Sequence, residues 1–374
     1  MGRHYSLDLL DAMERNKQEV EYKGVKILVK PIPEGGEDGD MDPRIIASTK
    51  KKLEMQKNAP EKVLSKEEEI LAMRTFFNTY RGDSIVSEGV DIEHILVDST
   101  DNYKVPVRVY RRAESEEKRP VMVYSHGGGF AGGSPAVLEE FCKLLVSKLD
   151  CVIFNIDYRL CPENSYPQPL DDCWNTLKWA YDNVEKYGGD PEKIVVAGDS
   201  AGGNLAAALT LKDREERTKM VKGQILAYPA VNMCGKETKF YHGIDPTLYR
   251  HSKEQGELLD ISLAMTAKIV GEDSNAGLIE RYVQGKIDPS HIYLSPLQDD
   301  MHDVPPTLLI FGEHDFLAFE DFAYAQTLNA AGRYVKTLIY RGMQHGFINE
   351  IGVTPQAEDS VNEIASFIRA CFSI

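Results

Sequence analysis

The chain has 374 residues, of which 43 are lysine or arginine and 59 are aspartate or glutamate, so its formal net charge is −16. A charge of this sign and size repels phosphate backbones and anionic lipid, which excludes a nucleic-acid-binding protein and a protein held electrostatically on a membrane. Hydrophobic residues make up 42% of the chain. This is enough for a large core and excludes a chain that is disordered throughout.

The N-terminal residues contain no apolar targeting segment, since charged residues recur every few positions up to Glu21. No window of the chain approaches the roughly 18 uninterrupted apolar residues that a membrane span needs. The six cysteines form no CxxC pair and no spacing typical of metal ligands. We therefore expect a cytoplasmic protein with reduced, mostly buried cysteines, no membrane segment, no metal and no cofactor.

The first 65 residues are charged and only weakly periodic. Asp42 and Pro43 can open a helix that runs to Lys57 and stops before Pro60. Ser65 and Glu68 have the spacing of a capping box, which predicts a second helix from there to Phe77. The three lysines at 50–52 are predicted to form a solvated helix face rather than a binding patch.

From about residue 88 the pattern changes to short apolar runs separated by amphipathic stretches. Apolar runs without polar alternation are typical of strands buried on both faces. Their alternation with helices indicates an α/β fold with a mostly parallel central sheet and helices on both faces. The expected strands are 90–97, 105–110, 121–125, 152–156, 194–197, 224–228, 307–311 and 335–340, and the expected helices are 170–187, 202–211, 319–331 and 356–372.

The interval between Pro229 and about Leu297 breaks this rhythm, because it has helical stretches such as 258–270 and no clear core strand. A structureless loop of about 70 residues is improbable inside a compact domain. We therefore expect an insertion with helices of its own.

Ser200 lies in the sequence Gly198-Asp199-Ser200-Ala201-Gly202, directly after the strand at 194–197 and before an alanine-rich helix. This is the G-x-S-x-G pattern in the strand–turn–helix context that exposes a nucleophilic serine at the edge of a sheet. A phosphate-binding turn is the alternative. It is disfavoured because no Lys-Ser/Thr pair follows and the G-x-G-x-x-G spacing is absent.

His126 and the three glycines that follow it end the strand at 121–125. Consecutive glycines leave the backbone open, so a substrate carbonyl could approach amide N–H groups closely. Acyl transfer needs such donors for the oxyanion of its tetrahedral intermediate. A mobile glycine loop without this role is the alternative interpretation.

Together, the segments 126–129, 157–163 and 198–203 resemble the hormone-sensitive-lipase-like esterases, also called bacterial lipase family IV, of the α/β-hydrolase fold. The resemblance covers about residues 70–374. Cys161 stands where the family motif usually has alanine, a change between two small residues. In that family the second and third glycines of the HGGG run and the residue after the nucleophile form the oxyanion hole. Carried over, these are Gly128, Gly129 and Ala201.

The same resemblance implies the remaining catalytic residues in the chain order Ser, Asp, His. The segment after the strand at 307–311 resembles the family's acid segment, with Asp315 at the catalytic place, and His345-Gly346-Phe347 resembles its HGF motif. Glu313 and Glu320 are rivals of Asp315 for the role of acid. His314 is a rival base, but it neighbours Asp315, and neighbours at a strand end point in opposite directions.

We therefore expect an α/β-hydrolase catalytic domain at 86–374, with a helical cap built from residues 1–85 and an insertion at about 231–292. The resemblance implies a serine carboxylesterase that hydrolyses short acyl esters, acetyl to about hexanoyl, of small soluble alcohols through an acyl-enzyme. Phe130 and Phe347 flank the catalytic loops and are candidate walls of the substrate pocket. A homodimer is the default expectation for this family.

Two other functions remain open. A serine peptidase or amidase on the same fold uses similar chemistry, and no feature of the sequence excludes it. A non-catalytic small-molecule receptor would use the hydrolase pocket without hydrolysis. Receptors that resemble this family lack the catalytic histidine, whereas His345 is present here.

Overall fold

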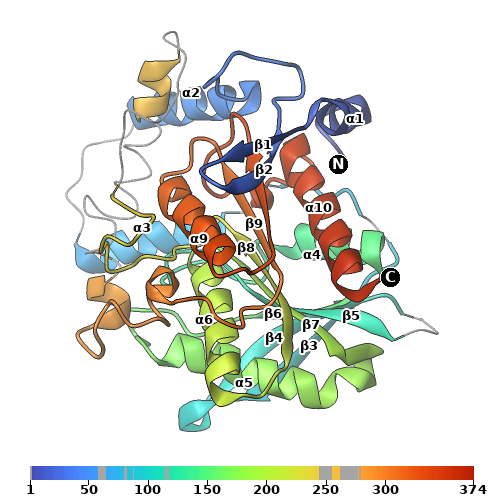
Figure 1. Cartoon of the computed structure of the whole chain (residues 1–374), viewed down its shortest axis with the longest axis vertical. Coiled ribbons are helices and arrows are strands. Elements are labelled where there is room, and N and C mark those ends of the chain that lie inside the picture. The colour runs from blue at the N-terminus through green and yellow to red at the C-terminus, as the bar shows by residue number, and fades with distance from the viewer. Residues whose placement is uncertain are drawn as a thin grey trace.

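A ten-stranded sheet organises the chain in the computed structural model, which describes residues 2–57, 65–79, 82–86, 88–113, 118–243, 255–261, 277 and 279–374 (Figure 1). The strands lie in the order β1-β2-β10-β9-β8-β7-β5-β6-β4-β3. Neighbours from β2 to β6 in this order pair in parallel, whereas β1 with β2, β6 with β4 and β4 with β3 pair antiparallel. The mostly parallel α/β sheet predicted from the sequence is confirmed.

The strands are β1 (Gln18–Tyr22), β2 (Val25–Lys30), β3 (Asp91–Asp98), β4 (Lys104–Arg111), β5 (Arg119–Ser125), β6 (Val152–Ile156), β7 (Gly189–Asp199), β8 (Val221–Ala227), β9 (Thr307–Gly312) and β10 (Val335–Tyr340). The helices are α1 (Leu7–Asn16), α2 (Pro43–Lys57), α3 (Lys66–Asn78), α4 (Glu139–Leu149), α5 (Gln168–Asn183), α6 (Ala201–Glu216), α9 (Ala318–Ala330) and α10 (Pro355–Phe372).

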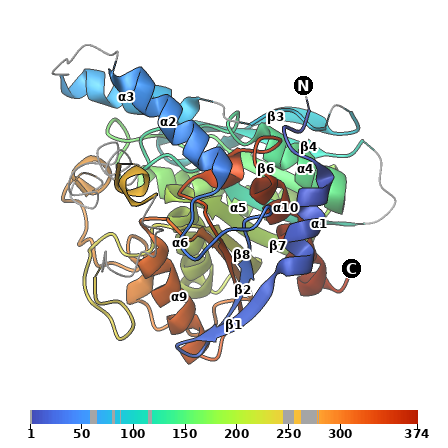
Figure 2. The same cartoon turned by 90° about the horizontal axis from the view of Figure 1, so that it is seen from above.

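Helices cover both faces of the sheet (Figure 2). On one face α10 packs against α1, α4, β8 and β9. On the other face α6 packs against α5, β7 and β8, while α9 packs on β9 and β10. This double covering explains why the central strands β5, β6 and β9 are buried at every position, as their uninterrupted apolar runs predicted.

All eight strands and all four helices expected after residue 88 are present, with bounds that differ by a few residues. β6 and β10 have the predicted bounds. The sequence analysis did not predict α1, β1, β2 or α4. Among these, α4 buries most of its residues on α10 and the sheet, so its amphipathic pattern is a local signal for this helix.

The N-terminal hairpin extends the sheet beyond β10. β2 pairs in parallel with β10, and β1 pairs with β2 through the turn at Lys23 and Gly24, whose φ angles are 49° and 80°. Two residues with positive φ make the tight turn that matches the twist of a β-hairpin. The hairpin therefore belongs to the sheet. Within residues 1–85, the expectation of a cap then applies to α2 and α3.

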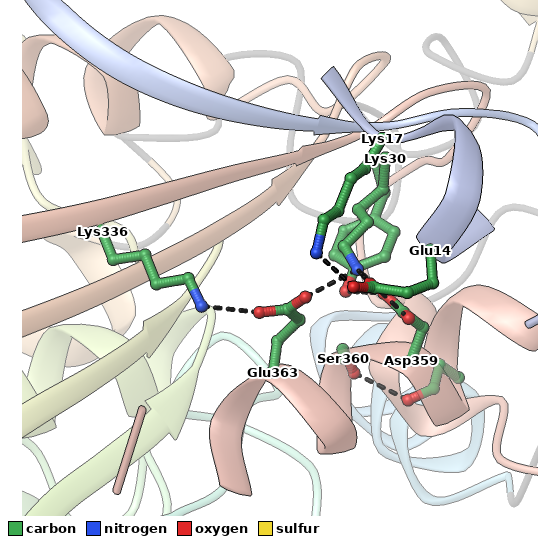
Figure 3. A network of polar contacts seen from close by, with 9 residues as sticks. Glu14, Lys17, Lys30, Lys336, Asp359, Ser360 and Glu363 are labelled. Atoms are coloured by element: carbon green, nitrogen blue, oxygen red, sulfur yellow. Dashed lines mark hydrogen bonds and ion pairs between the residues drawn. The ribbon is translucent and has the colours of Figure 1, made fainter. Parts of the chain in front are cut away.

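A buried lysine connects the hairpin to the last helix. Lys30, at the end of β2, has a fully buried side chain whose Nζ lies 2.6 Å from Glu363 and 3.1 Å from both Asp359 and Glu14 (Figure 3). Burial lowers the pKa of Lys30, but Asp359 and Glu363 on α10 outweigh this effect and raise it. The three carboxylates keep the ammonium charged, and the two on α10 attach α1 and the β1–β2 hairpin, which we call the N-terminal unit, to the rest of the fold.

α2 and α3 lie outside the two helix layers (Figure 1). Both were predicted, and the capping box of α3 is present in both directions between Ser65 and Glu68. Most of the helix expected at 258–270 lies outside the described residues; 256–261 are helical. The insertion also contains a π-helical turn at Ile279–Val283.

No helix within the described ranges combines the length and the apolar character needed to cross a membrane.

Candidate active site

Ser200 occupies a sharp turn between β7 and α6, with φ 55° and ψ −120°. Residues with a Cβ rarely adopt this conformation, and such strain is typical of functional turns. The Ser200 amide donates to the carbonyl oxygen of Ala227 at 2.9 Å. A Cβ on Gly198 would lie 2.2 Å from the carbonyl oxygen of Gly202, and one on Gly202 would lie 2.0 Å from that of Ser125. The glycines of the motif are therefore sterically required.

Ser200, His345 and Asp315 form a continuous hydrogen-bonded chain. His345 Nε2 lies 2.9 Å from Ser200 Oγ, and His345 Nδ1 lies 2.9 and 3.0 Å from the two carboxylate oxygens of Asp315. The serine follows β7, the aspartate follows β9 and the histidine follows β10. Parallel strands bring their carboxyl ends to one edge of the sheet, and this edge collects the three residues.

Asp315 is fully buried and also accepts the amide N–H of Leu317 at 2.9 Å. Its rival Glu313 points elsewhere and accepts the Gly342 amide at 3.0 Å, and the Nε2 of His314, the rival base, lies 3.3 Å from the Asp40 carbonyl oxygen. His314 and Asp315 thus point in different directions, as expected for neighbours after a strand.

Glu320, the other rival acid, lies at the start of α9. Its carboxylate accepts the amides of Val231 at 2.7 Å and Asn232 at 3.3 Å, and so holds the chain that leaves β8. Burial, with a contribution from the nearby Asp315, raises the pKa of Glu320 to about 7. The adjacent Asp321 is also fully buried, and burial raises its pKa well above the usual range.

Asp199 precedes the candidate nucleophile, but its side chain points away from it. The carboxylate accepts the hydroxyl of Tyr124 at 2.9 Å and the amide of Gly127 at 2.8 Å. Burial raises the pKa of Asp199. This residue therefore ties the serine turn to residues 126–133, which we call the oxyanion loop.

The peptide planes of the oxyanion loop are held by their carbonyl groups. His126 Nδ1 lies 2.9 Å from the Gly127 carbonyl oxygen, and the Gly128 carbonyl accepts the Gly132 amide at 2.9 Å. In a trans peptide the N–H points opposite to the C=O. The amides of Gly128 and Gly129 therefore point away from these bonds, and neither donates to an acceptor among the described residues.

Ala201 is the first residue of α6, so its amide is one of the N–H groups that a helix leaves without an internal partner. The positive end of the helix dipole lies at the same place and favours a developing negative charge. With Gly128 and Gly129, this gives three backbone donors from two segments packed against each other at Gly202 and Ser125.

Phe130 and Phe347, the expected pocket walls, are both buried. Phe130 is 0% exposed and stacks on Tyr282 of the insertion, with ring centroids 3.9 Å apart. Phe347 is 1% exposed and packs against Tyr228 and Tyr340. Their direct contact with substrate remains a proposal.

Two aromatic rings outside the site residues predicted from the sequence flank His345. The rings of Tyr228 and Phe316 both have centroids 4.7 Å from that of His345. Tyr228 is buried, whereas Phe316 is partly exposed. In the sequence, the position of Phe316 directly after Asp315 is the feature that could have predicted its place beside the site.

The described residues contain one cluster with the spacing of metal ligands. Asp299, Asp300 and His302 are the only group there whose ligand atoms lie within 4.8 Å of one another. Both carboxylate oxygens of Asp299 already accept bonds from Arg214 at 2.7 Å, and Asp300 and His302 are exposed. Exposed acidic groups of this kind are common, and the group contains none of the triad residues.

Comparison with known proteins agrees with this geometry. A family model described as alpha/beta hydrolase fold matches residues 122–349. The chain is 31% identical to the carboxylesterase NlhH of Mycobacterium tuberculosis, over 71% of this chain and 78% of that protein. It is 37% identical to the arylacetamide deacetylase of Oryctolagus cuniculus over 46% of each chain.

Among solved structures, a hyperthermophilic esterase from Pyrobaculum calidifontis is similar, with a TM-score of 0.66 and 28% identity over 88% of this chain and 98% of that one. The family model spans more than half of the chain, and the mycobacterial relative aligns with more than two thirds of it. The chain therefore belongs to the α/β-hydrolase fold family, in the hormone-sensitive-lipase-like group that its motifs resemble.

Proposed function

We propose that this protein is a serine carboxylesterase in which Ser200 is the nucleophile, His345 the general base and Asp315 the residue that orients the histidine. The observation that carries the proposal is the hydrogen-bonded chain from Ser200 through His345 to Asp315, with contacts of 2.9 Å on each side of the imidazole. This arrangement at the carboxyl edge of a parallel sheet is the geometry that nucleophilic serine catalysis requires. The family membership supports the same chemistry.

In the proposed reaction, His345 Nε2 takes the Ser200 proton while Ser200 Oγ bonds to the ester carbonyl carbon. The oxyanion of the tetrahedral intermediate accepts hydrogen bonds from the amides of Gly128, Gly129 and Ala201. The intermediate collapses, the bond to the alcohol oxygen breaks, and His345 returns the proton to the leaving alcohol. Water then attacks the acyl-enzyme by the same steps, releasing the acid and free Ser200.

The proposed substrates are acetyl to about hexanoyl esters of small soluble alcohols. The formal net charge of −16 disfavours work at an anionic lipid surface. A chain-length series of p-nitrophenyl esters from acetate to palmitate tests this proposal by comparing kcat/KM. We expect the maximum between acetate and hexanoate, and a maximum at decanoate or longer would contradict the short-acyl specificity.

Hydrolysis of aryl amides is the second candidate function. It is favoured by the rabbit relative, whose name, arylacetamide deacetylase, describes removal of acetyl groups from such amides. Measuring p-nitroacetanilide beside p-nitrophenyl acetate separates the two functions. A larger kcat/KM for the anilide would replace the carboxylesterase proposal with an amidase.

Three further expectations belong to the same proposal. Residues 1–85 and 231–292 contribute a helical cap over the catalytic domain at 86–374; α2 and α3 support the N-terminal part of this cap, since they lie outside the helix layers of the sheet. The protein works in the cytoplasm, and it forms a homodimer.

A further inference from the structure

Arg74, on the cap helix α3, donates hydrogen bonds to two loops beside the candidate site. Its Nε lies 2.9 Å from the carbonyl oxygen of Ala131 in the oxyanion loop. One terminal nitrogen lies 3.1 Å from the carbonyl oxygen of Cys161, and both terminal nitrogens bond to the carboxylate of Glu163, at 3.0 and 2.5 Å. The planar guanidinium therefore uses its fixed fork to hold three acceptors at once.

The peptide between Ala131 and Gly132 links Arg74 to a candidate oxyanion donor. Its C=O accepts from Arg74, and its N–H, which points the opposite way, donates to the Gly128 carbonyl at 2.9 Å. The orientation of that carbonyl in turn determines the direction of the Gly129 N–H, because the peptide is planar and trans. Through these two rigid peptide units, the position of the guanidinium affects the direction in which the Gly129 N–H points.

The packing around this connection leaves little freedom. A Cβ placed on Gly132 would lie 3.0 Å from the Phe77 ring and 3.4 Å from the Cα of Arg74, so the backbone of α3 lies directly on the oxyanion loop. The Cys161 amide donates to the Phe130 carbonyl at 2.9 Å. This bond joins the loop that contains Cys161 and Glu163 to the oxyanion loop.

The Arg74–Glu163 pair contributes little to global stability. The Arg74 side chain is 27% exposed and that of Glu163 is 57% exposed, and solvent-exposed ion pairs stabilise proteins by about 1 kcal/mol or less. The bond from Arg74 lowers the pKa of Glu163, so the carboxylate stays charged and holds the guanidinium in place. Removing Arg74 should therefore leave the protein folded.

We propose that Arg74 is a positioning residue, through which cap helix α3 orients the oxyanion loop. The inference rests on the proposed esterase function. Arg74 forms no hydrogen bond with Ser200, His345 or Asp315 among the described contacts. Its loss should therefore weaken stabilisation of the oxyanion and leave the shape of the pH profile of kcat/KM unchanged.

The test uses the full-length protein with Arg74→Gln, Arg74→Lys and Glu163→Gln. The matched control is Lys66→Gln, which also removes one positive charge from α3 and breaks an exposed ion pair with Glu280. For each variant kcat and KM are measured with p-nitrophenyl acetate between pH 5 and 9. The inhibition constant of a trifluoromethyl ketone is measured too, because its hemiketal with Ser200 carries an oxyanion.

For Arg74→Gln we expect kcat to fall about 10- to 100-fold, less than the loss on removing a whole oxyanion donor. KM should change less than about threefold, and the inhibition constant should rise by about the same factor as kcat/KM falls. Glu163→Gln should give a smaller decrease of the same kind. Arg74→Lys should restore little, since an ammonium cannot reproduce the planar fork.

A kcat of Arg74→Gln within twofold of the wild type, or a decrease equal to that of Lys66→Gln, would overturn the inference. So would an increase in KM with kcat unchanged, which would mean that Arg74 shapes the pocket. A shifted acidic limb of the pH profile would place its effect on the histidine instead. If Ser200→Ala retains full esterase activity, the proposed function fails first, and that outcome is visible without any Arg74 variant.

Discussion

Tyr282, from the insertion, lies flat on Phe130, from the oxyanion loop, with ring centroids 3.9 Å apart and ring planes 4° apart. Both side chains are buried. The Tyr282 carbonyl also accepts the amide of Tyr166 at 2.8 Å, and the Gln284 side chain donates to the Pro162 carbonyl at 2.9 Å. The insertion therefore contacts the oxyanion loop and residues 161–166. Arg74 contacts the same two segments from α3.

This stack predicts the effect of Tyr282→Ala. Truncation of a buried aromatic residue costs about 3–5 kcal/mol in a cooperative fold, and here it also removes the surface on which Phe130 rests. We expect the midpoint of urea unfolding to fall and kcat/KM for p-nitrophenyl acetate to decrease about tenfold or more. Tyr282→Phe, which keeps the ring, should behave like the wild type. Equal kcat/KM for Tyr282→Ala and the wild type would show that the stack does not support catalysis.

The triad predicts that Ser200→Ala and His345→Ala each lower kcat by a factor on the order of 10³ or more, since the members of a triad act as a unit. The matched control is His314→Ala, because His314 is buried next to Asp315 but lies against Asp40. It should retain most of the activity if the protein folds, as checked by circular dichroism. Residual activity of Ser200→Ala within tenfold of the wild type would contradict the assignment of the nucleophile.

The central sheet could be predicted because its strands are locally distinctive. Strands such as β6 are apolar at nearly every position, and burial on both faces requires this pattern. β1 gives no such signal, since all five of its residues are exposed. α1 buries only Met13. β1 depends on β2, which pairs with β10, and α1 depends on packing against α10, so both rely on the distant C-terminal part of the chain.

The residues of the candidate site also fall into those that the sequence predicts and those that it does not. Ser200, His345 and Asp315 follow strands in recognisable motifs, so a one-dimensional pattern was sufficient to place them at one sheet edge. Arg74 and Tyr282 lie in no motif, and they reach the oxyanion loop through contacts that span 57 residues for Arg74 and Ala131. Such contacts depend on how α3 and the segment around Tyr282 pack, which no local sequence pattern determines.

Glu320 predicts a pH dependence of stability. Its pKa in the fold is about 7, raised chiefly by burial, whereas an unfolded glutamate titrates near 4.5. Between these values the folded state binds more protons than the unfolded state, so this residue's contribution to stability is present below about pH 4.5 and is lost as pH rises through about 7. The slope approaches an order of 1 kcal/mol per pH unit.

Glu320→Gln should remove this slope, since its amide oxygen can still accept from Val231 but does not titrate. Urea unfolding at pH 5, 6, 7 and 8 measures the difference between variant and wild type. Glu313→Gln is the control, because Glu313 is also an acceptor of a backbone amide beside the site. A wild type and a Glu320→Gln variant with parallel stability profiles would show that Glu320 does not titrate in this range.

The buried ion pairs of Lys30 predict a large and specific loss of stability (Figure 3). Lys30→Met removes the ammonium and leaves Asp359 and Glu363 buried with less compensation, so the free energy of unfolding should fall by about 3–5 kcal/mol. Lys26→Met, on the same strand, breaks only an exposed pair with Glu19 at 3.7 Å and should cost about 1 kcal/mol or less. Adding Asp359→Asn to Lys30→Met should recover part of the loss, because it removes a buried carboxylate that has lost its cation, whereas Glu363 still pairs with Lys336 at 2.6 Å. If urea unfolding gives equal losses for Lys30→Met and Lys26→Met, the network does not hold the N-terminal unit in place.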